Sequence, residues 1–451
     1  MATTYRKNEH GFYVRPPHTL AVLYWLGLLV FSLFISLLST LTGAVTLRGV
    51  SWVLWFLVVA VVAWKTYDLA LRVRKAGTLP RFLTELRLEK AIRQTLLDTM
   101  TVNRQQSTPT VSVPDVFVSD KSPGYFNVTI EKLPGMSSAS IEDLKEHVTA
   151  TFRGKLERFG VVSALVTAEG NSFRFTLEDV GTDKTWRPTK PARAGKYKLI
   201  FQRGLVLDMA SRPHVAVWGK TGSGKSTVLL GLILQFFGMG ADVRFIDGKS
   251  EFSSFDKFYC KHKIGSNVAG VVGILERVKA EVEHRQQFIA ELNSQDGKMG
   301  RTAADLNYRP LVLLVDEIGA ILATMAPKSQ KEMIESLVAI IMKGRSVGVH
   351  VVLATQDPST DTLPSKIRSQ FSTRILLGSA NQETQRMAFG EVATTGQVEK
   401  FRGFYTCDGL TVQPMRFYVC DLHTHGLNDL TAFEQSYKLG SAVHYEYDSI
   451  F

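Results

Sequence analysis

Cysteine is scarce in this sequence of 451 residues. Cys260, Cys407 and Cys420 lie far apart and form no Cys-x-x-Cys pair, so neither a zinc site nor a disulfide framework is indicated. Scattered reduced thiols in a cytoplasmic domain are the simpler interpretation. With 45% hydrophobic and 21% charged residues the chain is not a disordered protein, and its length allows two or three domains.

Acidic residues are few near the N-terminus. Residues 1–104 contain 13 Lys or Arg and 5 Asp or Glu, so 8 of the net 11 positive charges lie there, which leaves about 3 for the rest of the chain. So small an excess is weak evidence for nucleic-acid binding. The basic balance of the whole chain therefore does not by itself predict DNA as a partner.

Charge is absent altogether between Arg15 and Arg48. The apolar run within this stretch is long enough to cross a bilayer, which needs about 20 residues. A second uncharged run, rich in Val, Leu and Trp, follows from Gly49 to Trp64. We expect two membrane helices, at about 20–41 and 49–66, and the short connection between them predicts a hairpin with both ends on one side.

Basic residues flank this hairpin on both sides, which places both flanks in the cytoplasm by the positive-inside rule. We therefore expect a multi-pass protein of the cell membrane with its bulk in the cytoplasm. A cleaved signal peptide and two buried core helices are competing interpretations, although the first run is long for a signal peptide. Anionic lipid headgroups are enough to explain the basic flanks.

Residues 78–104 predict an amphipathic juxtamembrane helix, because apolar residues recur there at helical spacing among charges. It could be a stalk or a packing helix. Residues 105–180 then predict a small α+β domain, for which no catalytic constellation is visible. Its expected elements are strands at 110–118 and 125–130, a helix at about 140–159, and strands near 161–167 and 172–177.

From Lys196 onward apolar strands alternate with helices, which predicts an α/β fold with a parallel sheet covered on both faces. The strand 214–218 runs into a Gly-x-x-x-x-Gly-Lys-Ser loop that a helix follows, as a phosphate-binding loop requires. The residues of this loop are Gly219, Lys220, Thr221, Gly222, Ser223, Gly224, Lys225, Ser226 and Thr227. Lys225 is expected to contact the β- and γ-phosphates of ATP, and Ser226 to bind Mg²⁺. A chance match in a glycine-rich turn is the alternative.

A partner motif comes at the end of the apolar strand 311–316. Asp316 is expected to help hold Mg²⁺, and Glu317 to act as the general base on water, although a carboxylate pair that merely caps a strand is the alternative. Gln356 ends the next buried strand and is a candidate sensor of the γ-phosphate, or else a residue that caps the following turn. These features predict an ATPase.

Further segments give this core a family likeness. The order and spacing of five segments between Lys196 and Asp421 resemble the FtsK/SpoIIIE motors of the HerA-FtsK superfamily. Residues 243–249 contain Ile-Asp-Gly-Lys where the family has Ile-Asp-Pro-Lys, and residues 281–285 are similar to its Met-Glu-x-Arg segment. Residues 343–358 and 372–375 resemble its "ARAAGIHLVLATQRP" and "PTRIAF" signatures.

The resemblance implies a RecA-like P-loop core at 195–422 that forms a ring, expected to be a hexamer, with ATP between subunits and double-stranded DNA in the central channel. An arginine from the neighbouring subunit would stabilise transition-state charge. Arg374 and Arg386 are the candidates, with Arg345 behind them, and each could instead be a structural ion-pair partner. DNA contacts in such a motor are expected to be with phosphates and to show little sequence specificity.

The chain differs from chromosomal FtsK proteins in ways that narrow its expected function. Only 30 residues follow Asp421, so the tail 423–451 is too short for a winged-helix DNA-reading domain, and there is no long Pro/Gln-rich linker or four-span membrane domain. Oriented chromosome pumping is therefore disfavoured. A hairpin within 1–76, a middle domain and one motor look like the coupling proteins of Gram-positive conjugative elements, similar to the TcpA type. A relaxase and conjugation-channel proteins would then be partners.

Other classes remain open at this point. A type VII-like protein-export ATPase shares the motor fold, but such chains usually carry several tandem motors, and this one has a single phosphate loop. A membrane scaffold whose nucleotide site only switches assembly conflicts with intact Lys225, Asp316 and Glu317. A DNA pump for plasmid or chromosome segregation, or a phage-related pump, is a close variant of the favoured class.

Overall fold

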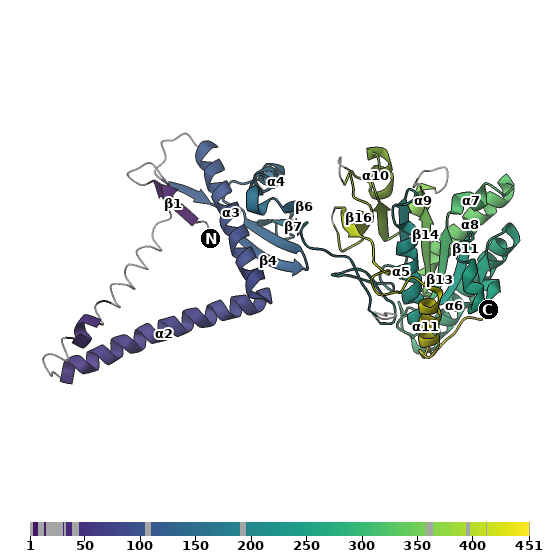
Figure 1. Ribbon diagram of the computed structural model, residues 1–451, viewed down its shortest axis with the longest axis horizontal. Helices are drawn as coiled ribbons and strands as arrows, with labels where there is room; N and C mark the ends of the chain where they lie inside the picture. Colours follow the sequence, from purple (N-terminus) through teal and green to yellow (C-terminus); the bar gives the residue numbers. More distant parts are fainter. Residues whose placement is uncertain are drawn as a thin grey trace. The chain divides into compact units, whose positions relative to one another are not determined.

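The chain divides into two compact units, Met1–Asp183 and Lys184–Phe451, in the computed structural model (Figure 1). The structure describes residues 3–7, 13–14, 30, 33–37, 45–103, 110–189, 195–356, 358, 364–393, 397–411 and 413–450.

Two long helices lead the first unit. α2 (Val45–Ala76) and α3 (Leu79–Asn103) are separated by Gly77, whose φ of 79° lies in the left-handed region that glycine tolerates. Large apolar side chains of α2 such as Trp52 and Phe56 are more than 70% exposed. No helix in the described part of this chain is both long and apolar enough to cross a membrane. Only residues 30 and 33–37 of the first predicted span are among the described residues, and the hairpin stays a prediction.

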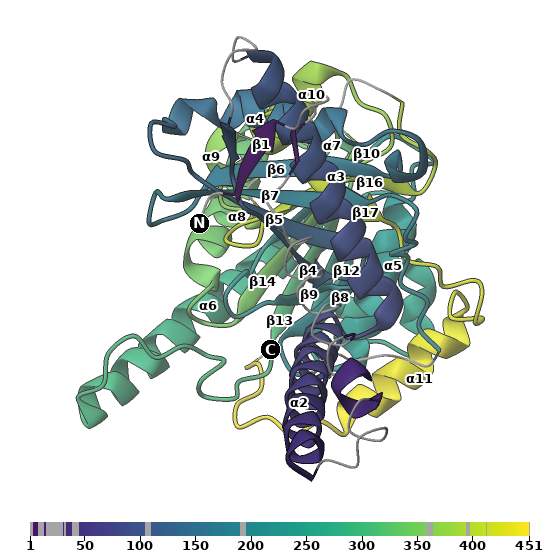
Figure 2. The ribbon, with the colours of Figure 1, turned by 90° about the vertical axis from the view of Figure 1, so that its left-hand side faces the viewer.

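α3 is a packing helix of the small domain. Its residues Leu88, Ile92 and Leu96 are buried against the sheet residues Phe173 and Phe175, and Figure 2 shows the helix crossing the strands. The sheet is antiparallel with the order β4-β5-β7-β6, and α4 packs beside it. The bounds are β4 Val116–Ser122, β5 Tyr125–Glu131, α4 Ile141–Ala150, β6 Phe159–Val166 and β7 Ser172–Asp179.

Two elements of this domain differ in the structure from those expected from the sequence. The expected strand at 110–118 is split at Pro114, which cannot donate a backbone hydrogen bond. Its first half, β3 (Thr110–Val113), pairs instead with the N-terminal strand β1 (Thr3–Lys7), which also pairs with β2 (Tyr13–Val14). The expected helix at 140–159 ends at Ala150, because the backbone becomes extended at Arg153, with φ of −125° and ψ of 154°, and only a short 3₁₀ turn follows at Gly154–Leu156.

The second unit is built on an eight-stranded sheet with the order β12-β11-β13-β14-β10-β15-β16-β17. Five neighbouring pairs are parallel, and β16 and β17 add an antiparallel edge, so the sheet is mixed rather than wholly parallel. The strands are β10 Val215–Gly219, β11 Asp242–Asp247, β12 Ile264–Gly265, β13 Leu311–Asp316, β14 Val349–Thr355, β15 Thr373–Leu377, β16 Arg402–Cys407 and β17 Met415–Tyr418. A separate hairpin, β8 Lys198–Gln202 and β9 Leu205–Asp208, precedes them.

Helices cover both faces because the central strands are apolar on both faces. On one face Trp218 and Ile246 pack with buried residues of α6 and α8. On the other face Phe245 meets Phe237 of α5, with ring centroids 6.3 Å apart. The helices are α5 Lys225–Gly238, α6 Val268–Asp296, α7 Ile318–Leu322, α8 Pro327–Gly344, α9 Ser365–Arg368, α10 Gln382–Phe389 and α11 Leu430–Ser441.

The predicted C-terminal tail is part of this packed unit. Its helix α11 lies against α5, where Ser436 donates a hydrogen bond of 2.6 Å to the carbonyl of Leu234. Further along, the backbone N–H of Ile450 donates to Glu281 of α6 over 3.1 Å. The tail therefore contributes to the core of the second unit.

Glu281 and Arg285 form a fully buried ion pair within α6, with 2.6 Å between Arg285 Nε and Glu281 Oε1. Arg285 Nη1 also donates to the carbonyls of Arg309 and Val347, at 3.0 and 3.1 Å. This pair ties α6 to the segments that enter β13 and β14. Arg285, which belongs to the segment compared with the family's Met-Glu-x-Arg, therefore has a structural role in this buried pair.

Candidate active site

The sheet order brings the predicted motifs to one edge. Three parallel strands end there: β10 at Gly219, β13 at Asp316 and β14 at Thr355. β14 lies between the other two, pairing Trp218 with Thr355 on one side and Asp316 with Ala354 on the other. Ligands gather at the carboxyl ends of strands in open α/β sheets.

The loop between β10 and α5 depends on its glycines. Gly222 and Gly224 have φ of 80° and 107°, which side-chain-bearing residues rarely adopt. A Cβ on Gly224 would lie 2.8 Å from the Phe401 ring, and one on Gly219 would lie 2.5 Å from Ser223 Oγ. The loop then delivers the N-terminus of the 14-residue α5, whose free N–H groups and dipole favour an anion.

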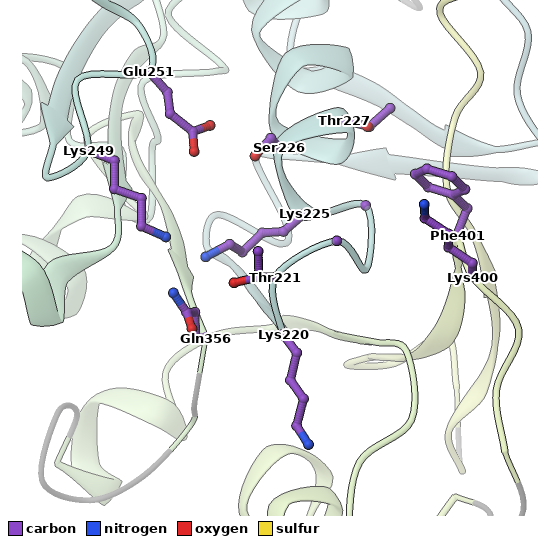
Figure 3. A pocket seen from close by; sticks show the side chains of 12 residues that line it. Lys220, Thr221, Lys225, Ser226, Thr227, Lys249, Glu251, Gln356, Lys400 and Phe401 are labelled. Carbon is purple, nitrogen blue, oxygen red and sulfur yellow. The ribbon is translucent and has the colours of Figure 1, made fainter.

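A cavity of about 240 Å³ lies over this loop (Figure 3). Of the nine predicted loop residues, all but Gly219 and Ser223 line it. The lining residues are Lys220, Thr221, Gly222, Gly224, Lys225, Ser226, Thr227, Lys249, Glu251, Gln356, Lys400 and Phe401. The predicted sensor Gln356 is therefore in the same cavity as the loop, and Figure 3 shows Lys225 extending toward it and Lys249.

Glu317 is held by Lys225, Lys249 and Thr355, and the side chain of Gln356 also hydrogen-bonds it. Its Oε2 lies 3.1 Å from Lys225 Nζ and 2.8 Å from Lys249 Nζ, and its Oε1 accepts from Thr355 Oγ1 at 3.2 Å. Burial alone would raise the pKa of this carboxyl, but the hydrogen bond from Lys249 and the charge of Lys225 lower it to about 2. Glu317 is thus ionised at neutral pH, and its φ of 52° is a strained backbone conformation for a non-glycine residue.

The pKa of Asp316, the neighbouring carboxylate, shifts in the opposite direction to that of Glu317. It is 1% exposed, and its Oδ1 lies 4.0 Å from Lys225 Nζ without a hydrogen-bond partner among the described residues. Burial raises its pKa to about 6, against the lowering effect of Lys225. A buried carboxylate oxygen without a donor suits a hard cation such as Mg²⁺, and both Ser226 and Lys225, the neighbour of Asp316, line the cavity over the phosphate loop. The residues present therefore fit the metal that the sequence predicts.

Lys249, Thr355, Glu251, Lys400 and Phe401 belong to the site but were not predicted from the sequence. A signal existed for Lys249, because it follows the end of β11, and Asp247 of that strand pairs with Asp316. Neighbouring strand ends share one edge of the sheet. The glycine before it is sterically required, since a Cβ on Gly248 would lie 2.8 Å from the carbonyl oxygen of Glu317.

The three candidate finger arginines lie outside their own chain's cavity. Arg374 Nη2 is 3.3 Å from Oδ1 of Asp408, the residue that follows the neighbouring strand β16. Arg386 is exposed on α10, and Arg345 is exposed at the end of α8. A residue that serves the neighbouring subunit is expected to be outside its own pocket, so these assignments stay predictions.

Comparison with known proteins decides the family of the core. Residues 177–360 match the model of the FtsK/SpoIIIE family. This chain carries an FtsK/SpoIIIE domain. The match begins before the motor boundary expected at 195, and the resemblance seen in the sequence motifs is confirmed.

Curated relatives of this FtsK/SpoIIIE domain include Ftsk domain-containing protein YdcQ of Bacillus subtilis, 30% identical over 195 residues, or 43% of this chain and 40% of YdcQ. DNA translocase FtsK of Haemophilus ducreyi is 29% identical over 248 residues, or 47% of this chain and 25% of that protein. The chain thus matches less than half the length of either relative.

Solved structures with similar chains include the pCW3 conjugation coupling protein TcpA in its monomer form with ATPγS, at a TM-score of 0.47 and 14% identity. That match covers 78% of this chain and 99% of TcpA. The cytoplasmic domain of the Thermomonospora curvata type VII secretion ATPase EccC matches at a TM-score of 0.42 and 19% identity, over 59% of this chain and 33% of EccC.

Proposed function

We propose that this protein is an ATP-hydrolysing motor that moves double-stranded DNA, and that it is the coupling protein of a conjugative transfer system. The observation that carries the ATPase assignment is the cavity lined by Lys225, Ser226 and Gln356, in which Lys225 Nζ lies 4.0 Å from Asp316 Oδ1 and 3.1 Å from Glu317 Oε2. The FtsK/SpoIIIE match and a relative named as a DNA translocase support DNA as the substrate.

The loop residues would bind the phosphates of ATP. The backbone N–H groups around Gly222 and Gly224 and the amine of Lys225 supply the positive field at the start of α5. Ser226 and Asp316 would hold Mg²⁺, which when bound neutralises charge on the phosphates. Binding also removes a cost, because the buried carboxylate of Asp316 then gains the partner that it lacks among the described residues.

Glu317 is the general base in this proposal, but with a pKa of about 2 it is a weak one as long as both lysines hold it. Lys225 and Lys249 can turn from this carboxylate toward the phosphates, which carry more charge. Their departure removes the two largest interactions that lower its pKa and leaves the hydrogen bonds of Gln356 and Thr355 to orient it. ATP binding would therefore activate the base, and Gln356 would sense the end of the phosphate chain.

The assembly proposed is a hexameric ring, in which Arg374 or Arg386 reaches the site of the next subunit. Grip on the duplex would come from contacts with phosphates, so motion would be nearly independent of sequence. The conjugative role rests on the domain order that the sequence predicts: an N-terminal hairpin, a middle domain and one motor. Partners would then include a relaxase and channel proteins.

We also propose that residues 1–76 anchor the protein in the cell membrane with the ATPase domain in the cytoplasm. The uncharged runs of the sequence support this proposal. Exposed aromatic side chains on α2 add to it: Trp52, Phe56 and Trp64 are 76%, 73% and 65% exposed, an arrangement that a lipid environment would stabilise.

The ATPase rate of the full-length protein with and without linear duplex DNA tests this function. We expect several unrelated duplexes to stimulate hydrolysis equally, and the stimulation to fall as salt is raised, because the contacts are with phosphates. An ATPase rate that no duplex changes, but that rises on addition of a secreted-protein tail, would instead assign the motor to protein export.

A further inference from the structure

Phe401 enters the cavity from the antiparallel edge of the sheet. β16 begins at Arg402 and runs opposite to β15, so its first residues lie at the edge where β10 and β15 end. Gly378, which follows β15, fixes this position by donating from its backbone N–H to the carbonyl of Arg402 over 2.8 Å. The sheet topology therefore brings Phe401 to the phosphate loop from 174 or more residues further along the chain.

The backbone at Phe401 is strained. Its φ of 60° is left-handed, which is unusual for a bulky residue and persists only where surrounding contacts impose it. Arg402 N–H donates to the carbonyl of Glu399, and Val419 N–H donates to the carbonyl of Phe401, each over 3.2 Å. These contacts hold a ring that is nevertheless 41% exposed, so the strain does not serve to bury it.

The ring faces the nucleotide cavity. It lies so close to the start of α5 that a Cβ on Gly224 would be 2.8 Å from its Cδ1. Lys400 Nζ lies 5.2 Å from the ring centroid, and both residues line the cavity. A cation over an exposed ring contributes little, so a ligand can displace this amine.

The position of the phosphates sets the direction of the nucleotide. Figure 3 shows Lys225 extending toward Lys249 and Gln356 on one side of the loop, with Phe401 and Lys400 on the other side. The γ-phosphate is expected on the side of Lys225 and Lys249, because both lysines donate hydrogen bonds there to Glu317, the proposed base. The nucleoside must then point toward Phe401.

We propose that Phe401 is the nucleobase-binding residue of this site and that its ring stacks on the purine of bound ATP. The proposal rests on the proposed ATPase function and adds the subsite that recognises the nucleoside. A strained, half-exposed aromatic ring at the end of a phosphate site is suited to this, because every base presents a flat π-face.

Binding of ATPγS and of inorganic tripolyphosphate to the full-length protein, measured by calorimetry, separates the base from the phosphates. Phe401→Ala is expected to raise the Kd for ATPγS by about tenfold or more and to leave the Kd for tripolyphosphate within about twofold. Phe401→Trp should restore nucleotide binding, and its added fluorescence should respond to ATPγS but not to tripolyphosphate. Phe288→Ala is the matched control. This ring is 39% exposed, close to the 41% of Phe401, but it belongs to α6 and does not line the cavity.

An unchanged Kd for ATPγS in Phe401→Ala, or equal losses for both ligands, overturns the stacking proposal. The proposed phosphate site is tested separately, since Lys225→Ala should bind neither ATPγS nor tripolyphosphate. If that variant binds both as wild type does, the phosphate site itself is misassigned.

Discussion

Replacing Glu317 by glutamine is expected to slow ATP hydrolysis by about 10²- to 10⁴-fold and to leave nucleotide binding in place. Glutamine keeps the shape of the side chain but cannot accept a proton. It also loses the charge that now pairs with Lys225 and Lys249 at 3.1 and 2.8 Å. Both amines are then free to bind phosphate, so the affinity for ATP should be equal to that of wild type or higher.

The measurement is single-turnover hydrolysis, together with the Kd for ATPγS. Glu335→Gln, an exposed carboxylate on α8 that pairs with Lys331, is the control and should behave as wild type. Turnover at the wild-type rate in Glu317→Gln would remove Glu317 as the base. A lost affinity for ATPγS would show that the two lysine contacts are needed to shape the site.

Replacing Asp316 by asparagine is expected to stabilise the nucleotide-free protein at pH 8 by up to about 3 kcal/mol while abolishing Mg²⁺-dependent hydrolysis. The pKa of Asp316 is raised from 3.8 to about 6, so the folded state prefers the protonated carboxyl. Each pKa unit corresponds to about 1.36 kcal/mol. The ionised side chain destabilises the fold fully above about pH 6, and this cost is absent below about pH 4, where both states are protonated.

Denaturant unfolding of wild type and Asp316→Asn between pH 4 and pH 8 tests whether the substitution stabilises the fold. The advantage of Asp316→Asn should be largest at pH 8, shrink as pH falls through 6, and vanish near pH 4. Addition of Mg²⁺ and ATPγS should stabilise wild type more than the variant. Asp256→Asn, at an exposed position, controls for a general loss of negative charge. No gain at pH 8 would mean that Asp316 is already compensated in the free protein.

The contiguous motifs could be predicted from the sequence because their geometry is local. A phosphate loop needs a strand, glycines and a helix in succession, and residues 215–238 supply all three. Glu317 and Gln356 each follow a buried strand directly, which places them at the edge of the sheet. Once the strand order is known, these positions meet without further information.

Phe401 could not be assigned in this way, and for Lys249 the sequence indicated only its position after β11, not the side chain that it contacts. The role of Phe401 depends on an antiparallel strand at the edge of the sheet, and no local pattern shows that β16 lies beside β15. Lys249 gains its role from the side chain of Glu317, which is 68 residues away in sequence. The tail was interpreted as a separate segment, although Tyr437 of α11 packs on Phe237 of α5 with ring centroids 5.7 Å apart and Ser436 donates to Leu234. The partner of this short amphipathic helix lies about 200 residues earlier in the chain, and no local pattern identifies it.

The central claim is that hydrolysis at this site drives motion along duplex DNA, and displacement of a short third strand from a linear triplex measures that motion directly. We expect ATP-dependent displacement by the full-length protein at similar rates whatever the flanking sequence. No displacement is expected with ATPγS or with the Glu317→Gln variant. A protein that hydrolyses ATP rapidly in the presence of the same duplex, yet leaves the third strand in place, would contradict it.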